Sequence, residues 1–341
     1  MNPSIERIAV LGAGAWGSTF ADVLARNGSP VVLWDKNPAA IETLAKNRAP
    51  FGVPELSLHE SVRLETVLSD AIAGCPAIVL VIPSQAIAPM AADLASLLGH
   101  ESRLIVLLSK GIDIASGDVL SRVIERTLPY CRVGVVSGPC IAREVAQGVP
   151  TSVAAASANP DDAIFLRDLV SSRTLRAYTQ HDLLGVELGG ALKNIIAIAA
   201  GIGDGLGFGA NTKAALMTRG LAEMSRLAAA MGASPVTLFG LAGLGDLAVT
   251  CFSPHSRNRT FGELLGKGKN PDEARNAIGM TVEGEPTARA ALALSQRHGI
   301  DMPITSVVVR ICAAELDPRE AVAALMQREL KDEFPPGLFT S

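Results

Sequence analysis

The sequence predicts an α/β fold in which an N-terminal Rossmann-type domain with a mostly parallel sheet precedes an all-α C-terminal domain. In the first half of the 341 residues, short apolar runs alternate with helical patterns. Continuous apolar strands separated by helices are typical of a parallel sheet that is covered on both faces. After about residue 180 the strand-like runs stop, and long windows rich in Ala, Leu and Gly follow. We therefore expect a Rossmann domain over residues 1–179, a helical domain over 180–330 and a tail over 331–341.

The individual elements follow from β-branched runs and from helical periodicity. Strands are predicted at Ile8–Leu11, Val31–Trp34, Ala77–Ile82, Leu104–Leu108, Val133–Val136 and Ser152–Ala156. Helices of the first half are predicted at Trp16–Asn27, Pro38–Asn47 and Ile87–Leu98. Those of the second half are predicted over residues 183–202, 210–231, 285–298 and 303–314, and several are apolar enough on all sides to lie in a core. The Phe-Pro-Pro-Gly stretch at 334–337 cannot be helical, which favours an irregular tail.

Composition and charge exclude several classes of protein. With 48% apolar and 19% charged residues, the chain is too apolar to be disordered. A formal charge of −4 provides no basic field for nucleic acid or an anionic membrane, and no apolar run approaches the roughly 18–20 residues of a membrane span. The five cysteines are too scattered for a zinc or redox motif, so we expect reduced thiols and no bound metal. These features predict a cytoplasmic protein with neither a nucleic-acid nor a membrane partner.

A glycine fingerprint follows the first predicted strand and opens the first predicted helix. Gly12 would make the tight turn, Gly14 would let a pyrophosphate approach the backbone, and Gly17 would let helix and strand pack closely. Asp35, at the end of the second strand, would bind the adenosine ribose and favour NAD, whereas Lys36 beside it leaves NADP open. Two alternatives are a glycine-rich turn without a ligand and a turn that binds another adenosine compound, such as S-adenosylmethionine.

A lysine is the expected acid–base group if the chain is a dehydrogenase. Neither Tyr130 nor Tyr178 has a lysine four residues later, zinc ligands do not cluster, and the histidines lie in no local motif. Lys193 is different, because its neighbours on the predicted helix face are all Gly or Ala and would leave room for a ligand. We expect it near the start of an apolar helix, where a lysine requires a partner or a function. The alternative is a structural ion pair or a lysine that reaches to solvent.

A second group of polar residues lies about 50 residues further along the chain. Glycines around Asp246 predict a tight turn that presents one carboxylate. Ser256, Arg257 and Asn258 follow a Ser-Pro pair and would begin a helix, with a hydroxyl, a guanidinium and an amide directed at one anion. Arginine binds phosphate in a bidentate manner, so a phosphate site is predicted here, with a solvated basic turn as the alternative.

Three loops follow predicted strands and are expected at the carboxyl edge of the sheet, where ligands of such sheets bind. They contain Ile82–Gln85, Ser109–Gly111 with Lys110, and Ser137–Cys140 with Gly138. Each could also be an ordinary strand–helix connection.

Eight motifs together resemble the bacterial type of NAD(P)-dependent glycerol-3-phosphate dehydrogenase. They are, in order, GAGAWG, VIPSQ, SKG, SGPCIARE, ELGGALKN, GLGDL, TCFSPHSRNRTFG and TVEG, and they extend the resemblance from about residue 7 to 325. The resemblance implies interconversion of dihydroxyacetone phosphate and sn-glycerol 3-phosphate for glycerophospholipid synthesis, with NAD or NADP as cofactor. It also implies a second domain like that of 6-phosphogluconate dehydrogenase.

The resemblance assigns roles to individual residues. It implies Lys193 as the catalytic acid–base group. The implied substrate ligands are Lys110, Gly138, Cys140, Lys193, Asp246, Ser256, Arg257 and Asn258. The implied cofactor contacts, with the fingerprint residues, are Gly12, Gly14, Ala15, Trp16, Gly17, Asp35, Lys36, Lys110, Ala142, Arg257 and Glu283.

Cys140 is a departure from the family pattern, because relatives usually have Ser or Thr at this position and a thiol is the weaker hydrogen-bonding group. We expect burial and the nearby Lys110 to lower the pKa of Lys193, and Asp246 to orient its ammonium. The rival hypotheses are a related reductase of a hydroxy acid or ketopantoate and a non-catalytic dinucleotide-binding sensor. The apolar helical domain is compatible with a homodimer.

Overall fold

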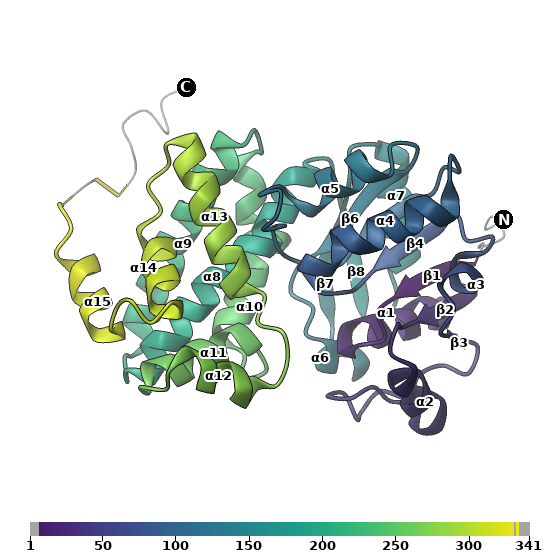
Figure 1. Cartoon of the computed structure of the whole chain (residues 1–341), viewed down its shortest axis with the longest axis horizontal. Coiled ribbons are helices and arrows are strands. Elements are labelled where there is room, and N and C mark those ends of the chain that lie inside the picture. Colours follow the sequence, from purple (N-terminus) through teal and green to yellow (C-terminus); the bar gives the residue numbers. More distant parts are fainter. Residues whose placement is uncertain (1–6, 331, 334–341) are drawn as a thin grey trace.

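Residues 7–330 and 332–333 are described by the structure, which is a computed structural model. Apart from residues 332 and 333, the predicted tail over 331–341 lies outside the described residues, and so does the Phe-Pro-Pro-Gly stretch at 334–337. Figure 1 shows a sheet with helices on both faces beside a body made of helices.

The first part of the chain forms one eight-stranded sheet with the order β3-β2-β1-β4-β5-β6-β7-β8. Its strands are β1 (Ile8–Leu11), β2 (Val31–Trp34), β3 (Arg63–Glu65), β4 (Ala77–Leu80), β5 (Leu104–Leu107), β6 (Arg132–Ser137), β7 (Thr151–Ser157) and β8 (Leu175–Gln180). Neighbouring strands are parallel except for β6 and β7, which are antiparallel. The predicted mostly parallel sheet is confirmed. The strand order reverses at β1, and the carboxyl edge at such a reversal is the usual ligand crevice.

The described helices divide between the two parts of the chain. Those interleaved with strands are α1 (Ala15–Arg26), α2 (Pro38–Asn47), α3 (Leu68–Ile72), η1 (Ser84–Ala86), α4 (Ile87–Leu98), α5 (Leu120–Thr127), α6 (Ala142–Ala146) and α7 (Pro160–Val170). Those after the sheet are α8 (Leu183–Gly205), α9 (Ala210–Ala230), η2 (Pro235–Phe239), η3 (Leu241–Gly245), α10 (Asp246–Phe252), α11 (Arg257–Gly266), α12 (Pro271–Ile278), α13 (Gly284–His298), α14 (Pro303–Cys312) and α15 (Pro318–Met326).

Helices cover both faces of the sheet because successive strand side chains point to opposite sides. Ile8 and Val10 of β1 belong to the core cluster under α1 and α7. Ala9 and Leu11 belong to the cluster under α4 and α5. Every residue of β1 is therefore buried, which explains its uninterrupted apolar sequence.

Two strands were not predicted, and both lie at the ends of the sheet. β3 has the sequence Arg-Leu-Glu and is only half covered, so it lacks an apolar run. Along β8, Leu175 and Ala177 are buried whereas Arg176 and Tyr178 are exposed. This alternation has the period of a half-buried edge strand rather than the continuous pattern that predicted the central strands.

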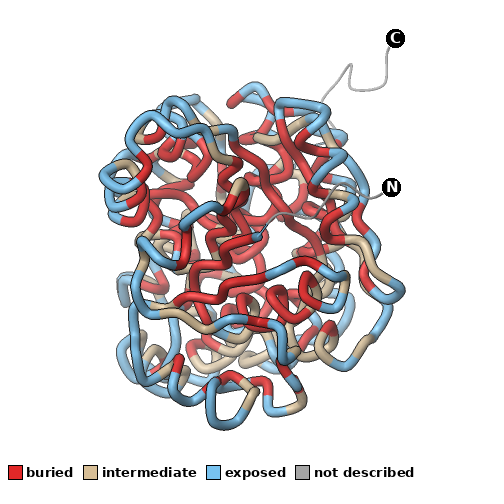
Figure 2. Tube along the Cα trace, turned by 90° about the vertical axis from the view of Figure 1, so that its right-hand side faces the viewer, coloured by how far each residue is buried: buried red, intermediate tan, exposed pale blue. Residues whose placement is uncertain are grey.

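Helix α8 is the core of the second part and also packs on β6 and β7 of the sheet. Contrary to the expectation that no segment approaches a membrane span, α8 is long and apolar enough to cross a membrane, but 83% of its most apolar window is buried inside the protein. Surrounding helices α9, α10, α11, α13 and α14 contribute to one hydrophobic cluster around it. Figure 2 shows the buried residues concentrated in the interior and the exposed ones on the outer turns.

Helices α8 and α11 pack unusually close together because both have glycines at the contact. A Cβ atom on Gly201 of α8 would lie 1.9 Å from the carbonyl oxygen of Arg259. Conversely, a Cβ atom on Gly262 of α11 would lie 2.0 Å from the carbonyl oxygen of Ile198. Only glycine fits at these points, so the two helix backbones touch and α11 has a fixed position relative to α8.

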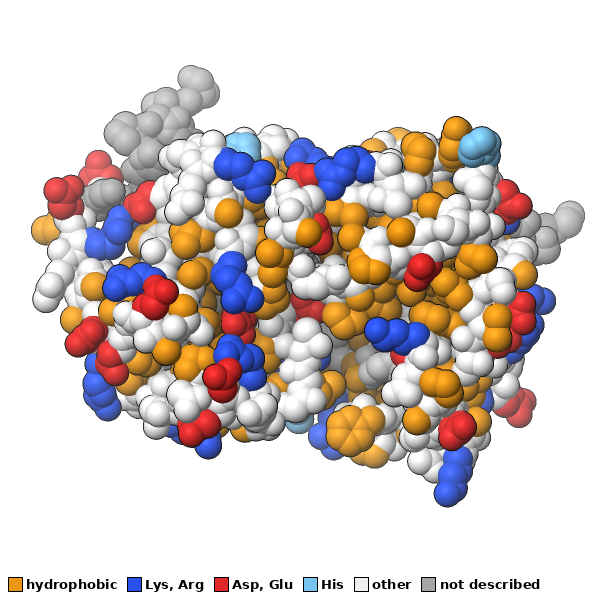
Figure 3. Space-filling view, in the orientation of Figure 1, with side chains coloured by type: hydrophobic (Ala, Val, Ile, Leu, Met, Phe, Trp, Pro, Cys, Tyr) orange, Lys and Arg blue, Asp and Glu red, His pale blue; other side chains and the backbone are white. Residues whose placement is uncertain are grey.

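The surface view in Figure 3 shows a hollow between the two parts of the molecule. On the face shown there, basic and acidic side chains are interspersed and do not form one patch of a single sign.

Candidate active site

Lys193 lies in the middle of α8, so the prediction that it stands near the start of a helix is wrong. The helix begins at Leu183 because the Asp182 side chain caps it, accepting a hydrogen bond from the Gly185 N–H at 2.9 Å. This capping aspartate was not used in the sequence argument, although Asp is a preferred residue at that position. The Lys193 side chain is consequently buried, with 7% of the residue exposed.

Asp246 also sits in a helical setting rather than in the predicted tight turn. The glycine-rich segment before it forms a π-helical turn, η3, and α10 begins at Asp246 itself. This turn packs directly on α8, because a Cβ atom on Gly189 would lie only 2.8 Å from the carbonyl oxygen of Ala242. The close approach places the Asp246 carboxylate against Lys193.

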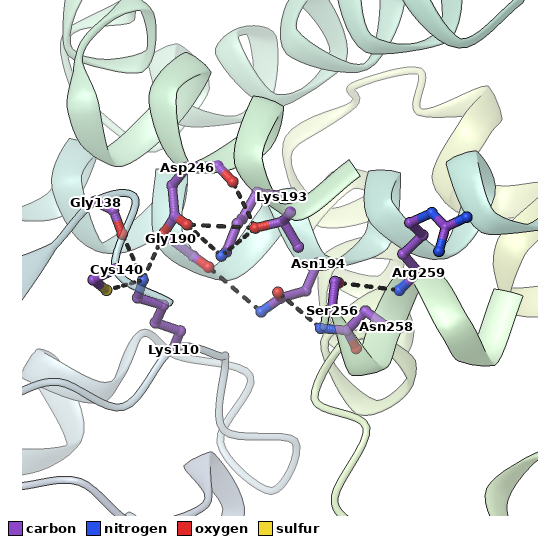
Figure 4. A network of polar contacts seen from close by, with 11 residues as sticks. Lys110, Gly138, Cys140, Gly190, Lys193, Asn194, Asp246, Ser256, Asn258 and Arg259 are labelled. Carbon is purple, nitrogen blue, oxygen red and sulfur yellow. Dashed lines mark hydrogen bonds and ion pairs between the residues drawn. The ribbon is translucent and has the colours of Figure 1, made fainter. Parts of the chain in front are cut away.

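The carboxylate of Asp246 is shared between two lysines from different parts of the chain (Figure 4). One oxygen, Oδ1, accepts a hydrogen bond from Lys193 Nζ at 2.5 Å. The other, Oδ2, accepts one from Lys110 Nζ at 2.6 Å. Lys110 follows β5, so this contact joins the sheet to the helical part. Two positive charges and one negative charge leave the cluster with an excess positive charge, which suits an anionic substrate or a developing oxyanion.

This cluster shifts the pKa values of the two lysines in opposite directions. Burial lowers the pKa of Lys193; Asp246 opposes this effect, and the nearby Lys110 adds to it. This is the direction expected from the sequence. For Lys110, burial acts to lower the pKa, but the effects of Asp246 and Cys140 together outweigh burial and the pKa is raised. Lys110 is therefore a permanent cation, whereas Lys193 exchanges its proton more readily.

Gly138 and Cys140 follow β6 and lie beside Lys110. The carbonyl oxygen of Gly138 accepts a hydrogen bond from Lys110 Nζ at 3.1 Å, and the Cys140 sulfur lies 3.5 Å from the same nitrogen. Burial raises the pKa of the Cys140 thiol despite the neighbouring ammonium groups. Gly138 has φ of +145°, and a Cβ atom there would meet the backbone of β7, so glycine is required. Lys110 thus has an acceptor for each of its three N–H bonds.

Ser256, Arg257 and Asn258 begin α11, as predicted. Ser256 is the N-cap, and its hydroxyl accepts a hydrogen bond from the Arg259 N–H at 3.2 Å. Arg257 is exposed at the first helical position, whereas Asn258 is buried. The Asn258 amide donates to Asn194 Oδ1 and accepts from the Gly284 N–H, both at 2.9 Å. Asn258 thereby links α11 to α8 and α13.

Arg259, the second arginine of the Ser-Arg-Asn-Arg sequence, turns away from this group. Its guanidinium donates to Asp204 at the end of α8, at 2.7 Å. Lys213 of α9 pairs with the same carboxylate at 2.7 Å. Arg259 therefore fixes the start of α11 to α8 and α9.

Two polar residues of the site were missed by the sequence analysis. The hydroxyl of Thr250 accepts a hydrogen bond from Lys193 Nζ at 2.7 Å. Asn194, next to Lys193, holds Asn258. Thr250 lies one helical turn after Asp246, so it could have been found by extending the predicted turn into a helix. With Asp246 and Thr250 as partners, Lys193 keeps one N–H bond for a substrate oxygen.

The fingerprint glycines have the surroundings that a dinucleotide site requires. Gly12 has φ of +114°, and a Cβ atom there would lie 2.4 Å from the Val81 carbonyl oxygen. At Gly17 a Cβ atom would lie 1.8 Å from the Gly12 carbonyl oxygen, whereas at Gly14 it would meet open space. Ala15 begins α1, which has no side-chain cap, so the first N–H groups of this helix are available to a phosphate.

The remaining predicted cofactor residues surround this turn. Asp35 accepts hydrogen bonds from the N–H groups of Ala13 at 2.8 Å and of Asn37 at 2.9 Å, so it also braces the turn. Lys36 is exposed beside it. Trp16 packs on Phe20, and among the described residues its indole nitrogen has no hydrogen-bond partner.

Ala142 and Glu283 come from different parts of the chain. Ala142 begins α6. Glu283 precedes α13 and accepts hydrogen bonds from Ser84, one from its N–H at 3.1 Å and one from its hydroxyl. Within residues 7–330 and 332–333, no group of three His, Cys, Asp or Glu side chains could hold a metal ion.

Comparison with protein families finds two matches that together cover most of the chain. Residues 7–163 match the N-terminal model of NAD-dependent glycerol-3-phosphate dehydrogenase, and residues 182–323 match its C-terminal model. A curated relative, the glycerol-3-phosphate dehydrogenase [NAD(P)+] of Anaeromyxobacter sp. (strain K), is 44% identical over 332 residues, which are 96% of this chain and 100% of the relative.

Solved structures give the same result. The crystal structure of glycerol-3-phosphate dehydrogenase from Coxiella burnetii has a TM-score of 0.90 and 39% identity, and the match covers 96% of this chain and 100% of that one. A ketopantoate reductase from Ralstonia eutropha has a TM-score of 0.57 at 14% identity, with 93% and 99% coverage. The second likeness shows a shared fold alone.

Proposed function

Because the chain belongs to the NAD-dependent glycerol-3-phosphate dehydrogenase family, we propose that Lys193 is the acid–base group of this enzyme. The protein is an NAD(P)-dependent oxidoreductase that interconverts glycerol 3-phosphate and its 2-keto form, dihydroxyacetone phosphate. The single observation that supports the residue assignment is the Asp246 carboxylate shared between Lys193 and Lys110. A reductase of a hydroxy acid or ketopantoate and a non-catalytic sensor are not favoured, since both halves match one dehydrogenase family.

When bound, NAD(P)H supplies the hydride that reduces the C2 carbonyl carbon. As negative charge develops on the carbonyl oxygen, the Lys193 ammonium donates a hydrogen bond to this oxygen through its remaining N–H group and then transfers the proton to it. Asp246 and Thr250 hold the other two N–H bonds and so aim the ammonium. In the reverse direction the neutral amine takes the proton from the C2 hydroxyl, and burial supports this by lowering the pKa of Lys193.

The substrate phosphate is proposed to bind at the start of α11. Arg257 is exposed there, at the first position of α11. Ser256 and Asn258 flank it, and the helix N-terminus adds a partial positive charge. Lys110, Gly138 and Cys140 are proposed to contact the substrate from the sheet. Binding the phosphate away from the reacting carbon would orient C2 against Lys193.

The cofactor is proposed to bind along the carboxyl edge of β1, with its pyrophosphate over Gly14 and the start of α1. Support comes from the open space at Gly14 and from the close packing at Gly12 and Gly17. Ala15, Trp16, Asp35, Lys36, Lys110, Ala142, Arg257 and Glu283 complete the proposed contacts. The neighbouring carboxylate and ammonium of Asp35 and Lys36 are compatible with both NAD and NADP.

We also propose the setting in which the enzyme works. It would act in the cytoplasm, as a homodimer, without a nucleic-acid or membrane partner, and would supply glycerol 3-phosphate to glycerophospholipid synthesis. Its division into residues 1–179, 180–330 and a tail over 331–341 is part of the same proposal. Analytical ultracentrifugation of the purified enzyme tests the dimer, and a sedimenting monomer at micromolar concentration would contradict it.

The function is tested by following NADH absorbance with and without dihydroxyacetone phosphate, and the same assay tests Lys193. We expect Lys193→Ala to lower kcat by at least ~10²-fold, the usual contribution of acid–base catalysis. The control is Lys267→Ala, which removes an exposed ion pair with Glu263 on α11 and is expected to keep wild-type turnover. Near-normal turnover in Lys193→Ala would refute the assignment.

A further inference from the structure

A second buried acidic residue on α8 lies outside the proposed site. Glu187 is 4% exposed and stands six residues before Lys193, which is about 9 Å along the helix axis. Six residues also rotate the side chain by roughly 120° from that of Lys193. The two side chains therefore point to different surroundings, and Glu187 is not part of the lysine cluster.

Glu187 binds an element of the other part of the molecule. Its Oε1 accepts a hydrogen bond from the Ser121 N–H at 2.8 Å, and its Oε2 accepts one from the Ser121 hydroxyl at 2.6 Å. Ser121 lies in the first turn of α5 and is 3% exposed. A carboxylate at a helix N-terminus compensates both the free N–H groups and the dipole of that helix. Burial raises the pKa of Glu187 to about 7, and the contact is a buried, hydrogen-bonded link between the sheet domain and α8.

The same face of α8 continues the contact toward the site. Gly190, one turn after Glu187, is so close to the sheet domain that a Cβ atom would lie 2.5 Å from Ser137 Oγ and 3.6 Å from the Lys110 side chain. Glu187 and Gly190 therefore both contribute to the depth and the rotation at which α8 sits on the edge of the sheet. Lys193 is on the next turn and follows that position.

One further polar link between the two parts joins Arg297 of α13 to the carbonyl oxygen of Gly117 at 3.3 Å, and two others involve proposed ligand residues. Lys110 pairs with Asp246, and Ser84 pairs with Glu283. Such groups must also serve the substrate or the cofactor. The Glu187–Ser121 link consists of groups with no assigned contact to either ligand, so it can hold the domains in place throughout the reaction.

We propose that Glu187 is a positioning residue, which through Ser121 fixes Lys193 and the substrate at the distance from the cofactor site that hydride transfer requires. This inference rests on the proposed function of Lys193. A displacement of about 1 Å between reacting groups costs on the order of 10²-fold in rate. A partial loosening of this link is therefore expected to slow hydride transfer while the residues that bind the substrate remain in place.

The chain contains a matched control for this inference. Glu223 of α9 is 1% exposed and accepts hydrogen bonds from the Thr305 N–H at 2.8 Å, the Thr305 hydroxyl at 2.7 Å and the Ile304 N–H at 2.9 Å. It caps α14 as Glu187 caps α5, but both of its partners belong to the helical domain. A substitution at Glu223 therefore weakens hydrogen bonds of the same kind, from a buried carboxyl group to the start of a helix, without loosening the link between domains.

The experiment compares Glu187→Gln with Glu223→Gln in the full-length enzyme. We expect Glu187→Gln to lower kcat by about tenfold, within the range set by misplacement of reacting groups, with little change in the KM for dihydroxyacetone phosphate. The deuterium isotope effect on kcat, measured with NADH deuterated at both C4 positions, is expected to rise because hydride transfer becomes the slower step. Glu223→Gln is expected to lower the Tm but to keep the wild-type kcat and isotope effect.

Two outcomes would overturn the proposal. One is a Glu187→Gln enzyme with wild-type kcat and isotope effect, and the other is an equal fall in kcat for both variants, which indicates general destabilisation. If Glu187→Gln does not fold, Ser121→Ala is compared with Thr305→Val instead. Each of these variants removes only the hydroxyl group that contacts one of the two glutamates, and kcat and the isotope effect again decide the outcome. Wild type and Lys193→Ala are assayed in parallel. Loss of the proposed function would appear there, as an inactive wild type or an active Lys193→Ala, and would overturn both proposals together.

Discussion

Lys193 and Lys110 carry the same ammonium group, but their surroundings move its pKa in opposite directions. Burial dominates at Lys193 and lowers its pKa. At Lys110 the attraction of Asp246, with a contribution from Cys140, exceeds the effect of burial and raises the pKa. The shared carboxylate of Asp246 therefore has an ammonium group of lowered pKa on one side and one of raised pKa on the other. This division fits an acid–base group beside an electrostatic substrate ligand.

Asp246→Asn is expected to move the pH dependence of reduction. Burial lowers the pKa of Lys193, Asp246 raises it, Lys110 lowers it and Cys140 makes a smaller raising contribution. Removal of the carboxylate charge therefore lowers the pKa of Lys193 further. Lys193 must be protonated to act as the acid. In Asp246→Asn its protonated fraction therefore decreases at a lower pH than in the wild type as the pH is raised. The alkaline limb of kcat/KM for dihydroxyacetone phosphate should shift to lower pH, and the free energy of unfolding should fall by about 3–5 kcal/mol because two buried cations lose their partner. A pH–rate profile and chemical denaturation measure the two effects.

Asp204→Asn provides the comparison, because Asp204 is also a carboxylate shared between two cations, Lys213 and Arg259. It is expected to lose stability and to leave the alkaline limb where it is in the wild type. A limb that stays fixed in Asp246→Asn, or that moves equally in both variants, would argue against the assigned electrostatics.

For single residues of the proposed site, the sequence identifies the charged side chains better than it identifies their hydrogen-bond partners. Lys193 follows from the absence of a Tyr-x-x-x-Lys pair and from its small neighbours. Thr250 and Asn194 do not follow, because their hydrogen bonds depend on how α10 and α11 pack on α8. Asn258 was expected to face a phosphate, but its amide is already bonded to two other helices, which no local pattern indicates.

Among the elements, α8 and α11 form the frame that relates the proposed proton donor, Lys193, to the proposed phosphate site. Lys193 is on α8, and Ser256–Asn258 open α11. Because glycines let the two backbones touch, the distance between these groups is set by backbone contact rather than by flexible side chains. This contact makes the geometry of the site sensitive to a single methyl group.

Gly201→Ala is expected to disturb that frame. The added Cβ atom would lie 1.9 Å from the Arg259 carbonyl oxygen and 2.8 Å from its carbon, so the start of α11 must move. We expect a loss of about 1–3 kcal/mol in the free energy of unfolding, typical of overpacking, together with a higher KM for dihydroxyacetone phosphate. Thermal unfolding and steady-state kinetics measure the two effects.

Gly203→Ala on the same helix is the matched control. Its nearest neighbour would be Phe208 at 3.8 Å, an ordinary van der Waals distance. Alanine is a better helix former than glycine, so this variant should be as stable as the wild type or more so, with an unchanged KM. Equal behaviour of the two variants would contradict the proposed frame.

The elements that the sequence predicted are those whose pattern is local and complete. The ranges of α2 and α4 agree with those predicted, as do β1 and β2, because apolar periodicity and Pro or Gly at the ends are both present. The edge strands β3 and β8 and the π-helical turn before Asp246 were missed. Edge strands are half exposed and lack a continuous apolar run, and the glycines of η3 are typical of a turn until packing against α8 is known.

In the whole molecule, neither half contains all the residues of the proposed site. The sheet domain supplies the fingerprint turn and Lys110, whereas the helical domain supplies Lys193, Asp246 and the start of α11. The fold class and the division of labour follow from the alternation of strands and helices and from the order of the motifs. The depth at which α8 sits on the sheet does not, since it depends on contacts such as Glu187–Ser121 that join segments far apart in the chain.

A test at this scale separates cofactor binding from folding. NADH that binds only the folded state stabilises it by RT ln(1 + [L]/Kd), or about 2.7 kcal/mol at a concentration 100 times Kd. Gly14→Ala should remove most of this gain, because Gly14 has open space before it, where the pyrophosphate is proposed to lie. Its φ is −71°, so alanine introduces no backbone strain.

Gly209→Ala is the control for that test. Gly209 is likewise an exposed glycine N-cap with extended backbone, φ −91°, and open space around it, but it begins α9 in the helical domain. Both variants should lose the same small stability without ligand, since alanine is a poor N-cap. With NADH, thermal unfolding should show the full gain for Gly209→Ala and little for Gly14→Ala. If NADH stabilised both variants equally, the pyrophosphate would have to bind somewhere other than the start of α1. The two helix caps are otherwise equivalent, so only a ligand bound at that turn would make the variants differ.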